Sequence, residues 1–431
     1  MTRNPNRVQP SHSRQYSDIM KQIYIALFVI LYFFNIQQSQ AQVTDGLIAY
    51  YPFDNGCTWV DYSNFANSNG TPCGANPQCV CGVEGQAVKL NGLDNCALLL
   101  GVVNNYFSST DFSLSFYLRP GAAAGRQTIF SKREDCTETK AFYVTYSPGV
   151  NIINAELIEN SGKKHILSAK LDSDRCWHHI VLVRSGSTAK LFVNGNLQPQ
   201  AQSTTTSRVN IINNAVLNVG APCAGSADRY FSGELDEIRI YDKALSKQEI
   251  ESLDFHPEQI LTPDTIIYLG SPIMPRISEN CDITYSWSPT DGISDPTDSA
   301  SLITPTQAGN FVYSLTFKLG ACNAKDSMRI TVIDPTTLPC DKVYLPNAFT
   351  PNGDNINDRF GVSNPYAIQE FISLEIFDRW GGRVFFTDNP LTTWDGTANG
   401  QLLNPGVFLY KIRFKCDNKE ISDFGSLTIV R

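Results

Sequence analysis

Residues 233–241 read Gly-Glu-Leu-Asp-Glu-Ile-Arg-Ile-Tyr, so apolar side chains recur between charged ones along this stretch. Such alternation is typical of a β-strand with one buried face. A few residues later, Ser246 and Glu249 have the spacing of a capping box, in which each side chain bonds the backbone N–H of the other residue at a helix start. The stretch therefore predicts a half-buried strand followed by one short helix.

Segments with the same strand pattern precede this stretch through the N-terminal half of the chain. Turn residues separate them, and Asn194-Gly195 is a hairpin signal between two of them. The pattern predicts an all-β domain over residues 42–253. Its other strands are expected within residues 46–53, 85–92, 112–119, 127–132, 177–184 and 189–196.

The composition agrees with short strands joined by turns. Only 18% of the 431 residues are charged, below the usual share of about 25%. The net charge of −8 comes without a basic stripe, which makes nucleic acid or an anionic membrane surface a poor partner. At this length we expect about two to four domains.

Three phrases identify a family resemblance in the first domain: W-H-H-I-V-L-V from Trp177, L-F-V-N-G from Leu191, and G-E-L-D-E-I-R-I-Y-D-K-A-L-S from Gly233. They resemble the laminin-G-like, or concanavalin A-like, lectin and glucanase superfamily. The resemblance implies an antiparallel jelly roll of two sheets. It does not imply one function, because this sandwich hosts lectins, adhesion modules and hydrolases.

A hydrolase interpretation can be tested on residues 234–239. Laminarinase-like relatives carry two catalytic glutamates as E-x-D-x-x-E on one strand, which places them on either side of the bond to be cut. Here Glu234 and Asp236 begin the pattern, but Arg239 stands where the second glutamate is required. A guanidinium does not give up its proton at neutral pH, so we predict no enzyme and a structural role for these groups. His178 and His179 are expected to be one packed and one solvated imidazole.

A calcium ion is a further expectation for the first domain. Calcium-binding relatives of this sandwich, the pentraxins and laminin-G modules, use an Asp-Asn turn with acids from a neighbouring loop, which Asp94 and Asn95 resemble. Asp135 follows another strand and is the candidate acid, although Lys132 and Arg133 beside it oppose a cation. Calcium needs six to eight oxygen ligands. The alternative is an ordinary turn stabilised by the Asx side chains.

The middle of the chain contains a second predicted sandwich between two linkers. Residues 254–265 and 335–342 hold prolines and few apolar side chains, as linkers do. Residues 266–334 resemble PKD or immunoglobulin-like repeats, with Trp287 as the core tryptophan. Members of this type mostly act as spacers, which the resemblance implies here.

The last segment, residues 343–431, begins with Y-L-P-N-A-F-T-P-N-G-D-N-I-N-D-R-F at Tyr344 and ends in a strand. With the later phrases F-D-R-W-G-G, T-W-D-G and P-G-V-F-L-Y, it resembles the gliding-motility-associated C-terminal domain, a type B sorting domain of the type IX secretion system. The resemblance implies the secretion machinery as a partner. It also implies delivery to the exterior of the outer membrane or to the medium.

The N-terminus is predicted to be a signal peptide, residues 1–41. An apolar run from Ile23 to Phe34 is short for a membrane span, and Ser39 and Ala41 fit a signal-peptidase site. No stable transmembrane span would remain after its removal. A retained N-terminal anchor is the alternative, and Met20 would make a more ordinary start than Met1.

Twelve cysteines in an exported chain favour disulfides over metal clusters. Each predicted domain holds an even number, which suggests pairing within domains. We predict a Cys281–Cys322 bond in the middle domain, because it would join opposite ends of a small core and stabilise it by about 2 to 4 kcal/mol.

Together these observations predict an exported, non-catalytic surface or secreted protein whose first domain binds a glycan or a surface protein. One alternative is a glycoside hydrolase with catalytic carboxylates elsewhere, and another is a purely structural adhesin.

Overall fold

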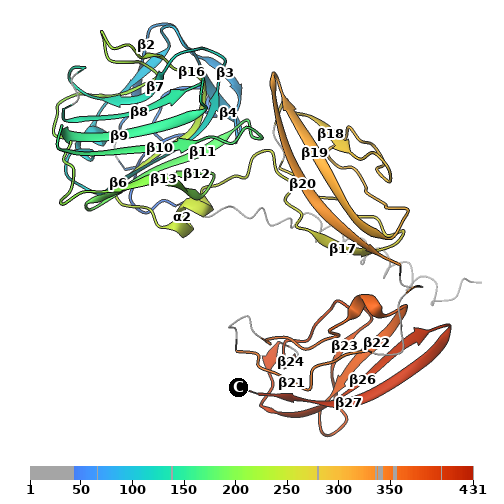
Figure 1. Ribbon diagram of the computed structural model, residues 1–431. Coiled ribbons are helices and arrows are strands. Elements are labelled where there is room, and N and C mark those ends of the chain that lie inside the picture. The colour runs from blue at the N-terminus through green and yellow to red at the C-terminus, as the bar shows by residue number, and fades with distance from the viewer. Residues whose placement is uncertain are drawn as a thin grey trace, which may run out of the picture. The chain divides into compact units, whose positions relative to one another are not determined.

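The structure is a computed structural model that describes residues 43–430, apart from 66, 137–138, 279–280, 335–336, 338–342, 353–356 and 399. Its regular structure is almost entirely β, which confirms the predicted fold class (Figure 1). The predicted signal peptide, residues 1–41, and most of the linker 335–342 lie outside the described residues. In the described part of the chain, no helix is long and apolar enough to cross a membrane.

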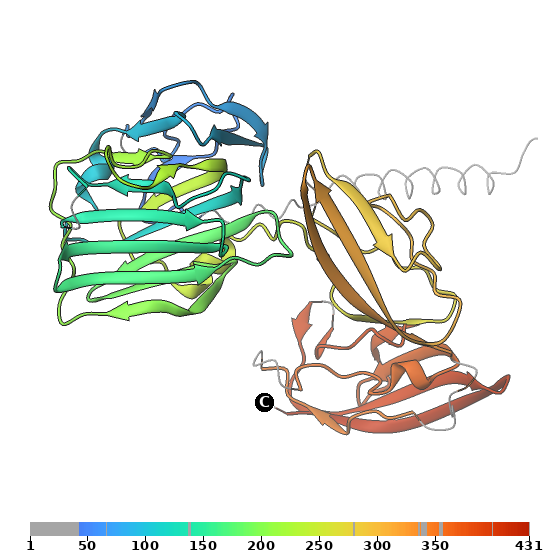
Figure 2. The same cartoon turned by 45° about the horizontal axis from the view of Figure 1, so that its top comes forward.

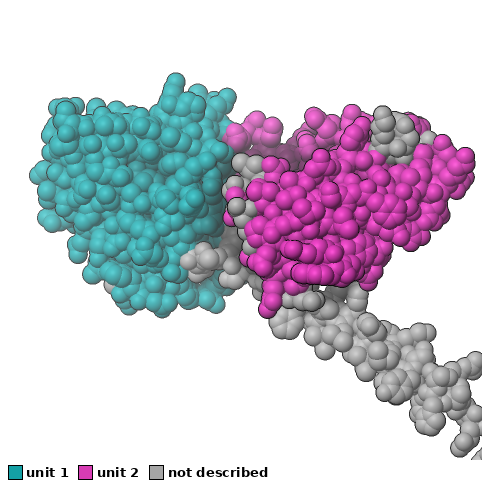
Figure 3. All heavy atoms as spheres, turned by 90° about the horizontal axis from the view of Figure 1, so that it is seen from below, with its two compact units in different colours: residues 1–80, 86–171, 179–255 teal, residues 81–85, 172–178, 256–431 magenta. Residues whose placement is uncertain are grey.

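The chain divides into two compact units, coloured separately in Figure 3. The first comprises residues 1–80, 86–171 and 179–255, and the second comprises residues 81–85, 172–178 and 256–431. Two short segments of the predicted first domain thus belong to the second unit. The finer division into a middle and a C-terminal domain remains a prediction.

The N-terminal half forms two eight-stranded sheets (Figure 2). Sheet A consists of β1 (Leu47–Tyr51), β3 (Gln78–Cys81), β4 (Gln86–Asn91), β6 (Phe112–Pro120), β11 (His178–Ser185), β12 (Thr188–Val193), β13 (Asn196–Thr204) and β16 (Ser232–Tyr241). Sheet B consists of β2 (Gly70–Cys73), β5 (Cys96–Leu99), β7 (Gln127–Lys132), β8 (Ala141–Ser147), β9 (Ile152–Asn160), β10 (Lys163–Lys170), β14 (Leu217–Val219) and β15 (Arg229–Tyr230). The short segment η1 (Val102–Asn105) follows β5.

One hydrophobic core fills the space between these sheets. Leu235 and Ile240 of β16 contribute to it from sheet A. Phe116 of β6 meets Phe130 of β7 with ring centroids 4.8 Å apart, so aromatic side chains pack directly across the core. After β16 the helix α2 (Lys247–Ser252) begins at Ser246, and both hydrogen bonds of the predicted capping box are present.

The described part of the second unit contains a four-stranded sheet, a five-stranded sheet and the two-stranded sheet β24-β25. The first has the strand order β17-β20-β19-β18, and Trp287 on β18 is buried in it. At the five-stranded sheet, Phe349, Phe360 and Trp394 pack in one core. The strands are β17 (Thr265–Tyr268), β18 (Thr284–Ser288), β19 (Gly309–Leu319), β20 (Cys322–Ile333), β21 (Ala348–Phe349), β22 (Glu370–Phe377), β23 (Arg383–Thr387), β24 (Thr397–Ala398), β25 (Gln401–Leu402), β26 (Gly406–Cys416) and β27 (Lys419–Ile429), with η3 (Pro365–Ala367) before β22.

The predicted bond between Cys281 and Cys322 is wrong. Cys281 is bonded to Cys81, and Cys322 is bonded to Cys176, with Cα–Cα distances of 5.8 and 5.9 Å. The strand order explains this, because β19 lies between β18, which follows Cys281, and β20, which begins at Cys322. Two strand spacings amount to about 9 to 10 Å, beyond the reach of one disulfide. Both observed bonds lie inside the second unit, which includes residues 81–85 and 172–178.

The other described disulfides tie loops of the first sandwich. They join Cys57 to Cys79, Cys73 to Cys96, and Cys136 to Cys223.

Candidate functional site

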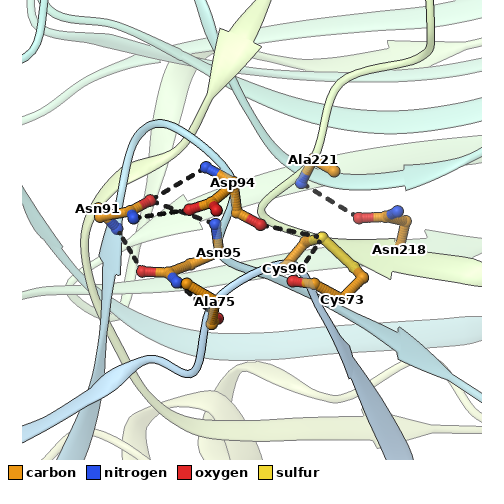
Figure 4. The surroundings of a disulfide bond; sticks show 8 residues. All are labelled: Cys73, Ala75, Asn91, Asp94, Asn95, Cys96, Asn218 and Ala221. Atoms are coloured by element: carbon orange, nitrogen blue, oxygen red, sulfur yellow. Dashed lines mark hydrogen bonds between the residues drawn. A yellow bond between two sulfur atoms is a disulfide. The ribbon is translucent and has the colours of Figure 1, made fainter.

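Asp94 and Asn95, the predicted calcium ligands, lie in a tight turn around the side chain of Asn91 (Figure 4). The Asn91 side-chain oxygen accepts hydrogen bonds from the backbone N–H groups of Asp94 and Asn95 at 3.1 and 3.2 Å, and its amide nitrogen donates to Asp94 Oδ1 at 2.8 Å. The Asn95 amide donates to the Ala75 carbonyl at 2.6 Å. These bonds are those of an Asx-stabilised turn, and the Cys73–Cys96 bond lies beside it.

Gly74 allows this turn to pack closely against its neighbour. Its φ is +74°, and a Cβ atom built at this position would lie 2.0 Å from the Asp94 carbonyl oxygen. A larger residue would therefore push the Asp94 turn away.

Asp135, the third predicted ligand, is exposed in the loop after β7. Its neighbour Glu134 accepts a hydrogen bond from Asn214 N at 2.6 Å and is thus used within the fold. Among the residues that the structure describes, no group of three or more His, Cys, Asp or Glu side chains is placed to hold a metal ion. Calcium binding stays a prediction.

Glu234 and Asp236 project from the face of β16 that is opposite to the core residue Leu235. Glu234 forms an ion pair with Arg119 of the neighbouring strand β6, and a weaker one with Lys89 of β4 at 4.0 Å. Asp236 is fully buried and accepts a hydrogen bond from Glu237 N at 2.8 Å. Both carboxylates are therefore held by groups of the same sheet.

The next residue, Glu237, was not singled out by the sequence, although it becomes the partner of Arg239. A β-bulge between Asp236 and Arg239 gives Glu237 a φ of +52°, and such bulges redirect side chains. Glu237 forms a buried ion pair with Arg239 and accepts a hydrogen bond from the Tyr50 hydroxyl at 2.8 Å. Burial raises the pKa of Glu237, while the adjacent guanidinium opposes that rise.

The two histidines are both buried, so the expectation that one is solvated is wrong. The His179 ring stacks on Tyr117 with centroids 4.7 Å apart, and its Nε2 lies 2.8 Å from Ser115 Oγ. The Tyr117 hydroxyl donates to the Leu253 carbonyl at 3.0 Å, so the segment after α2 covers this face. Burial lowers the pKa of His178 to about 4.

The outer face of sheet B carries a different polar network, which we call the Asp228 cluster: Arg126, Thr128, Arg133, Tyr143, Glu156 and Asp228. Most residues of the cluster lie on or next to strands β7, β8 and β9. These strands are hydrogen-bonded neighbours and lie side by side in Figures 1 and 2. Core residues Phe142 and Val144 alternate with Tyr143 on β8, so Tyr143 points to the outer side.

Asp228 is the centre of this cluster. Arg126 binds it through two hydrogen bonds, Nε to Oδ1 at 2.6 Å and Nη2 to Oδ2 at 3.2 Å. Thr128 Oγ1 donates to Oδ2 at 3.4 Å, and Arg133 Nη2 lies 3.9 Å from the same oxygen. Two-point binding of a carboxylate by a guanidinium fixes the geometry of both groups. The Asp228 side chain is only 3% exposed, whereas that of Arg126 is 48% exposed.

Tyr143 extends the cluster across the sheet. The Arg133 guanidinium lies 4.7 Å from the centre of its ring, and its hydroxyl donates to Glu156 Oε2 at 2.7 Å. Arg133 is 6% exposed, and its Nε and Nη2 have no hydrogen-bond partner in the described structure. The cluster thus combines a carboxylate, an aromatic ring and buried N–H donors that have unused capacity.

A disulfide holds the loops that carry this cluster. Cys136 and Cys223 are bonded, and they lie close in sequence to Arg133 and Asp228 respectively. Sequence reasoning missed the cluster, because Arg126 and Asp228 are 102 residues apart and no local motif connects them. Arg133 was noted only as a charge that opposes calcium binding.

Several solved structures resemble the chain. Domain 4 of AbnA, a GH43 extracellular arabinanase from Geobacillus stearothermophilus solved with arabinotriose, is 23% identical, covers 48% of this chain and 98% of its own, and has a TM-score of 0.39. Trypanosoma rangeli sialidase in complex with sialic acid is 15% identical over 48% of this chain and 32% of its own, with a TM-score of 0.38. The binding domain of botulinum neurotoxin serotype C1 is 12% identical, and the match covers 90% of this chain and 95% of its own, with a TM-score of 0.41.

Comparison with curated proteins finds no match. Two family models do match the chain. Residues 95–251 match the concanavalin A-like lectin/glucanases superfamily, and residues 343–429 match the CHU_C type IX secretion signal domain. Both are families that the sequence motifs predicted, whereas the PKD resemblance of residues 266–334 remains a prediction. The chain therefore carries a concanavalin A-like domain and a type IX secretion signal domain, and it is exported to the cell surface or secreted.

Proposed function

We propose that this protein is an exported binding or adhesion protein, and that its first sandwich binds a glycan or another surface ligand through the Asp228 cluster. The C-terminal domain supplies the signal for the secretion machinery. The observation that carries the proposal is the bidentate pair of Arg126 and Asp228 on the outer face of sheet B.

The chemistry of the cluster suits sugar hydroxyls. A carboxylate accepts hydrogen bonds from them, a guanidinium donates to them, and a tyrosine offers both an apolar ring and a hydroxyl. Asp228 fixes the orientation of Arg126, while the exposed remainder of the Arg126 side chain stays accessible. A site whose polar groups are already oriented loses less entropy on binding.

A non-catalytic role fits the carboxylates on β16. Glu234 is neutralised by Arg119, and the second glutamate of the hydrolase pattern is replaced by Arg239, which is itself paired with Glu237. A retaining or inverting pair needs one carboxylic acid that can protonate the leaving group and one free carboxylate. The paired side chains of β16 do not provide this combination.

A glycan array probed with the full mature chain tests the proposal. We expect binding to a defined set of glycans, and a loss of at least about tenfold in affinity for Arg126→Ala, which removes an oriented charged donor. Arg208→Ala is the matched control, because Arg208 forms a partly exposed ion pair with Asp111 at 2.7 Å elsewhere on the sandwich.

Two outcomes would overturn the proposal. Absence of binding to any glycan or cell-surface fraction would favour the purely structural adhesin. Release of new reducing ends from a bound glycan, abolished by Glu234→Gln, would instead establish the hydrolase.

A further inference from the structure

We propose that a groove on the outer face of sheet A binds a small amphipathic carboxylate, meaning an acyl or aryl body that ends in one carboxylate group. The groove lies between strands β11–β13 and the residues that lead into α2, and all of its lining residues belong to the first unit. Its volume of about 590 Å³ is that of a typical small-molecule site. It is separate from the Asp228 cluster, which is on sheet B.

The strand register gives the groove a polar end and an apolar end. Thr188, Lys190 and Phe192 alternate along β12, so their side chains share one face at intervals of about 6.8 Å. Pairing places Ser185 of β11 opposite Thr188, and Leu197 of β13 opposite Phe192. Two hydroxyls therefore lie at one end, two apolar side chains lie at the other, and Lys190 stands between them.

The charges in the groove favour an anion. Within the described residues, the Lys190 ammonium group has neither an ion pair nor a hydrogen bond, although the residue is half-buried. The second cation, Lys247, pairs with the exposed Glu251 at 3.1 Å. Among the described residues that line the groove there is no aspartate or glutamate, even though the chain as a whole carries a net charge of −8. A ligand carboxylate would supply the missing counter-charge for Lys190.

The apolar end favours a hydrocarbon body on that anion. Leu197 is 41% exposed beside the largely buried Phe192, and Leu245 contributes to the groove from the segment before α2. Covering such a surface stabilises a complex by about 25 cal/mol per Å² of apolar area. A carboxylate at Lys190 can also accept from the Ser185 hydroxyl, while its chain covers Phe192 and Leu197. A neutral apolar molecule would leave Lys190 without its partner.

Calorimetric titration of the full mature chain with octanoate, and with 1-octanol as the neutral comparator, tests this inference. We expect octanoate to bind more tightly than octanol, and Lys190→Gln to weaken octanoate binding about tenfold without changing octanol binding. Leu197→Ser should weaken both ligands. Lys163→Gln is the matched control, because Lys163 pairs with Glu159 at 2.8 Å on sheet B.

The partial exposure of Lys190 and Leu197 makes folded variants the expectation, and circular dichroism checks this. Absence of octanoate binding to the unmodified chain would overturn the inference. So would equal affinities for octanoate and octanol, or an unchanged affinity in Lys190→Gln. Glycan binding by Arg126→Ala and octanoate binding by Lys190→Gln are independent readouts, so either proposal can fail alone.

Discussion

Cys176 and Cys322 are bonded to each other across 146 residues of sequence. Cys81 and Cys281 are bonded across 200. Each bond joins a cysteine from the first 253 residues to a cysteine from residues 266–334. The two sequence regions are therefore linked by two disulfides as well as by the connecting segment 254–265.

We predict that cutting this segment does not release two fragments. A chain with a specific protease site inserted between Thr262 and Pro263 should run as one species after cleavage, and separate only when a reductant is added. The comparison variant replaces Cys81, Cys176, Cys281 and Cys322 with serine, and its fragments should separate without reductant. Separation of the unmodified chain under non-reducing conditions would show that these bonds do not form.

The buried pair of Glu237 and Arg239 provides a stability prediction. Arg239→Met leaves Glu237 buried without its counter-charge, which should lower the free energy of unfolding by about 3 to 5 kcal/mol. Adding Glu237→Gln to that variant should recover part of the loss, because the unpaired charge is then removed. Urea unfolding of both variants measures the difference. Equal stability of the single and double variants would mean that the ion pair is not formed.

Acid should destabilise the fold through its buried histidines. Burial lowers the pKa of His165, and of His178, to about 4 from the ordinary 6.5. The unfolded chain therefore binds more protons than the folded chain between about pH 4 and 6.5, so stability falls as the pH is lowered through that window. We expect a loss on the order of 1 kcal/mol per histidine at pH 5.

Variants at His165 check the cause of this pH dependence. His165 is fully buried, its Nδ1 lies 3.0 Å from Ser203 Oγ, and Arg184 is the nearby cation that further disfavours its protonation. His165→Gln should reduce the slope of stability against pH between pH 5 and 7, and the part due to His178 should remain. A variant that keeps the full slope would assign the effect to other groups.

Calcium at the Asp94 turn remains a prediction that thermal unfolding can test. A ligand that binds only the folded state raises the melting temperature, so calcium should raise it, a chelator should lower it, and Asp94→Asn should remove both effects. Asp135→Asn tests whether the acidic loop takes part. If neither calcium nor chelator changes the melting temperature, the turn is held without an ion by its own hydrogen bonds, those of Asn91 and the bond from Asn95 to Ala75.

Removal of residues 343–431 should prevent delivery to the cell surface, because the secretion signal match is confined to residues 343–429. The first sandwich has its own core and should remain folded inside the cell envelope. Protease shaving of intact cells distinguishes the two locations. Normal surface amounts of the truncated chain would contradict the assignment of the signal to this segment.

Local patterns were enough to predict much of this architecture. The strand at residues 233–241 and the capping box at Ser246 depend on neighbours in sequence, and both form in the structure. The expectation of one buried face was wrong, because the charged side chains of this strand are buried as well as the apolar ones. Pairing across long separations was not predictable in the same way. An even number of cysteines in each region is compatible with two bonds inside the regions or two bonds between them, and the structure has the second arrangement.

The candidate site was harder to predict for a similar reason. The Asp228 cluster forms only because the Cys136–Cys223 bond and the strand order of sheet B bring distant loops together. Likewise, the orientation of the Glu237 side chain depends on a β-bulge, and the sequence of this stretch contains no residue typical of such a bulge. The φ of +52° at Glu237 is rare for glutamate. The motif comparison identified Arg239 but not its partner.

The connectivity of Cys81 also constrains the order in which the chain matures during export. A chain that is made and exported from its N-terminus presents Cys81 and Cys176 to the oxidising compartment well before Cys281 and Cys322 arrive. During that interval Cys81 is two residues from Cys79, with which it must not stay bonded. Correct pairing therefore requires that Cys81 and Cys176 stay reduced, or exchange their first partners, until residue 322 has been exported.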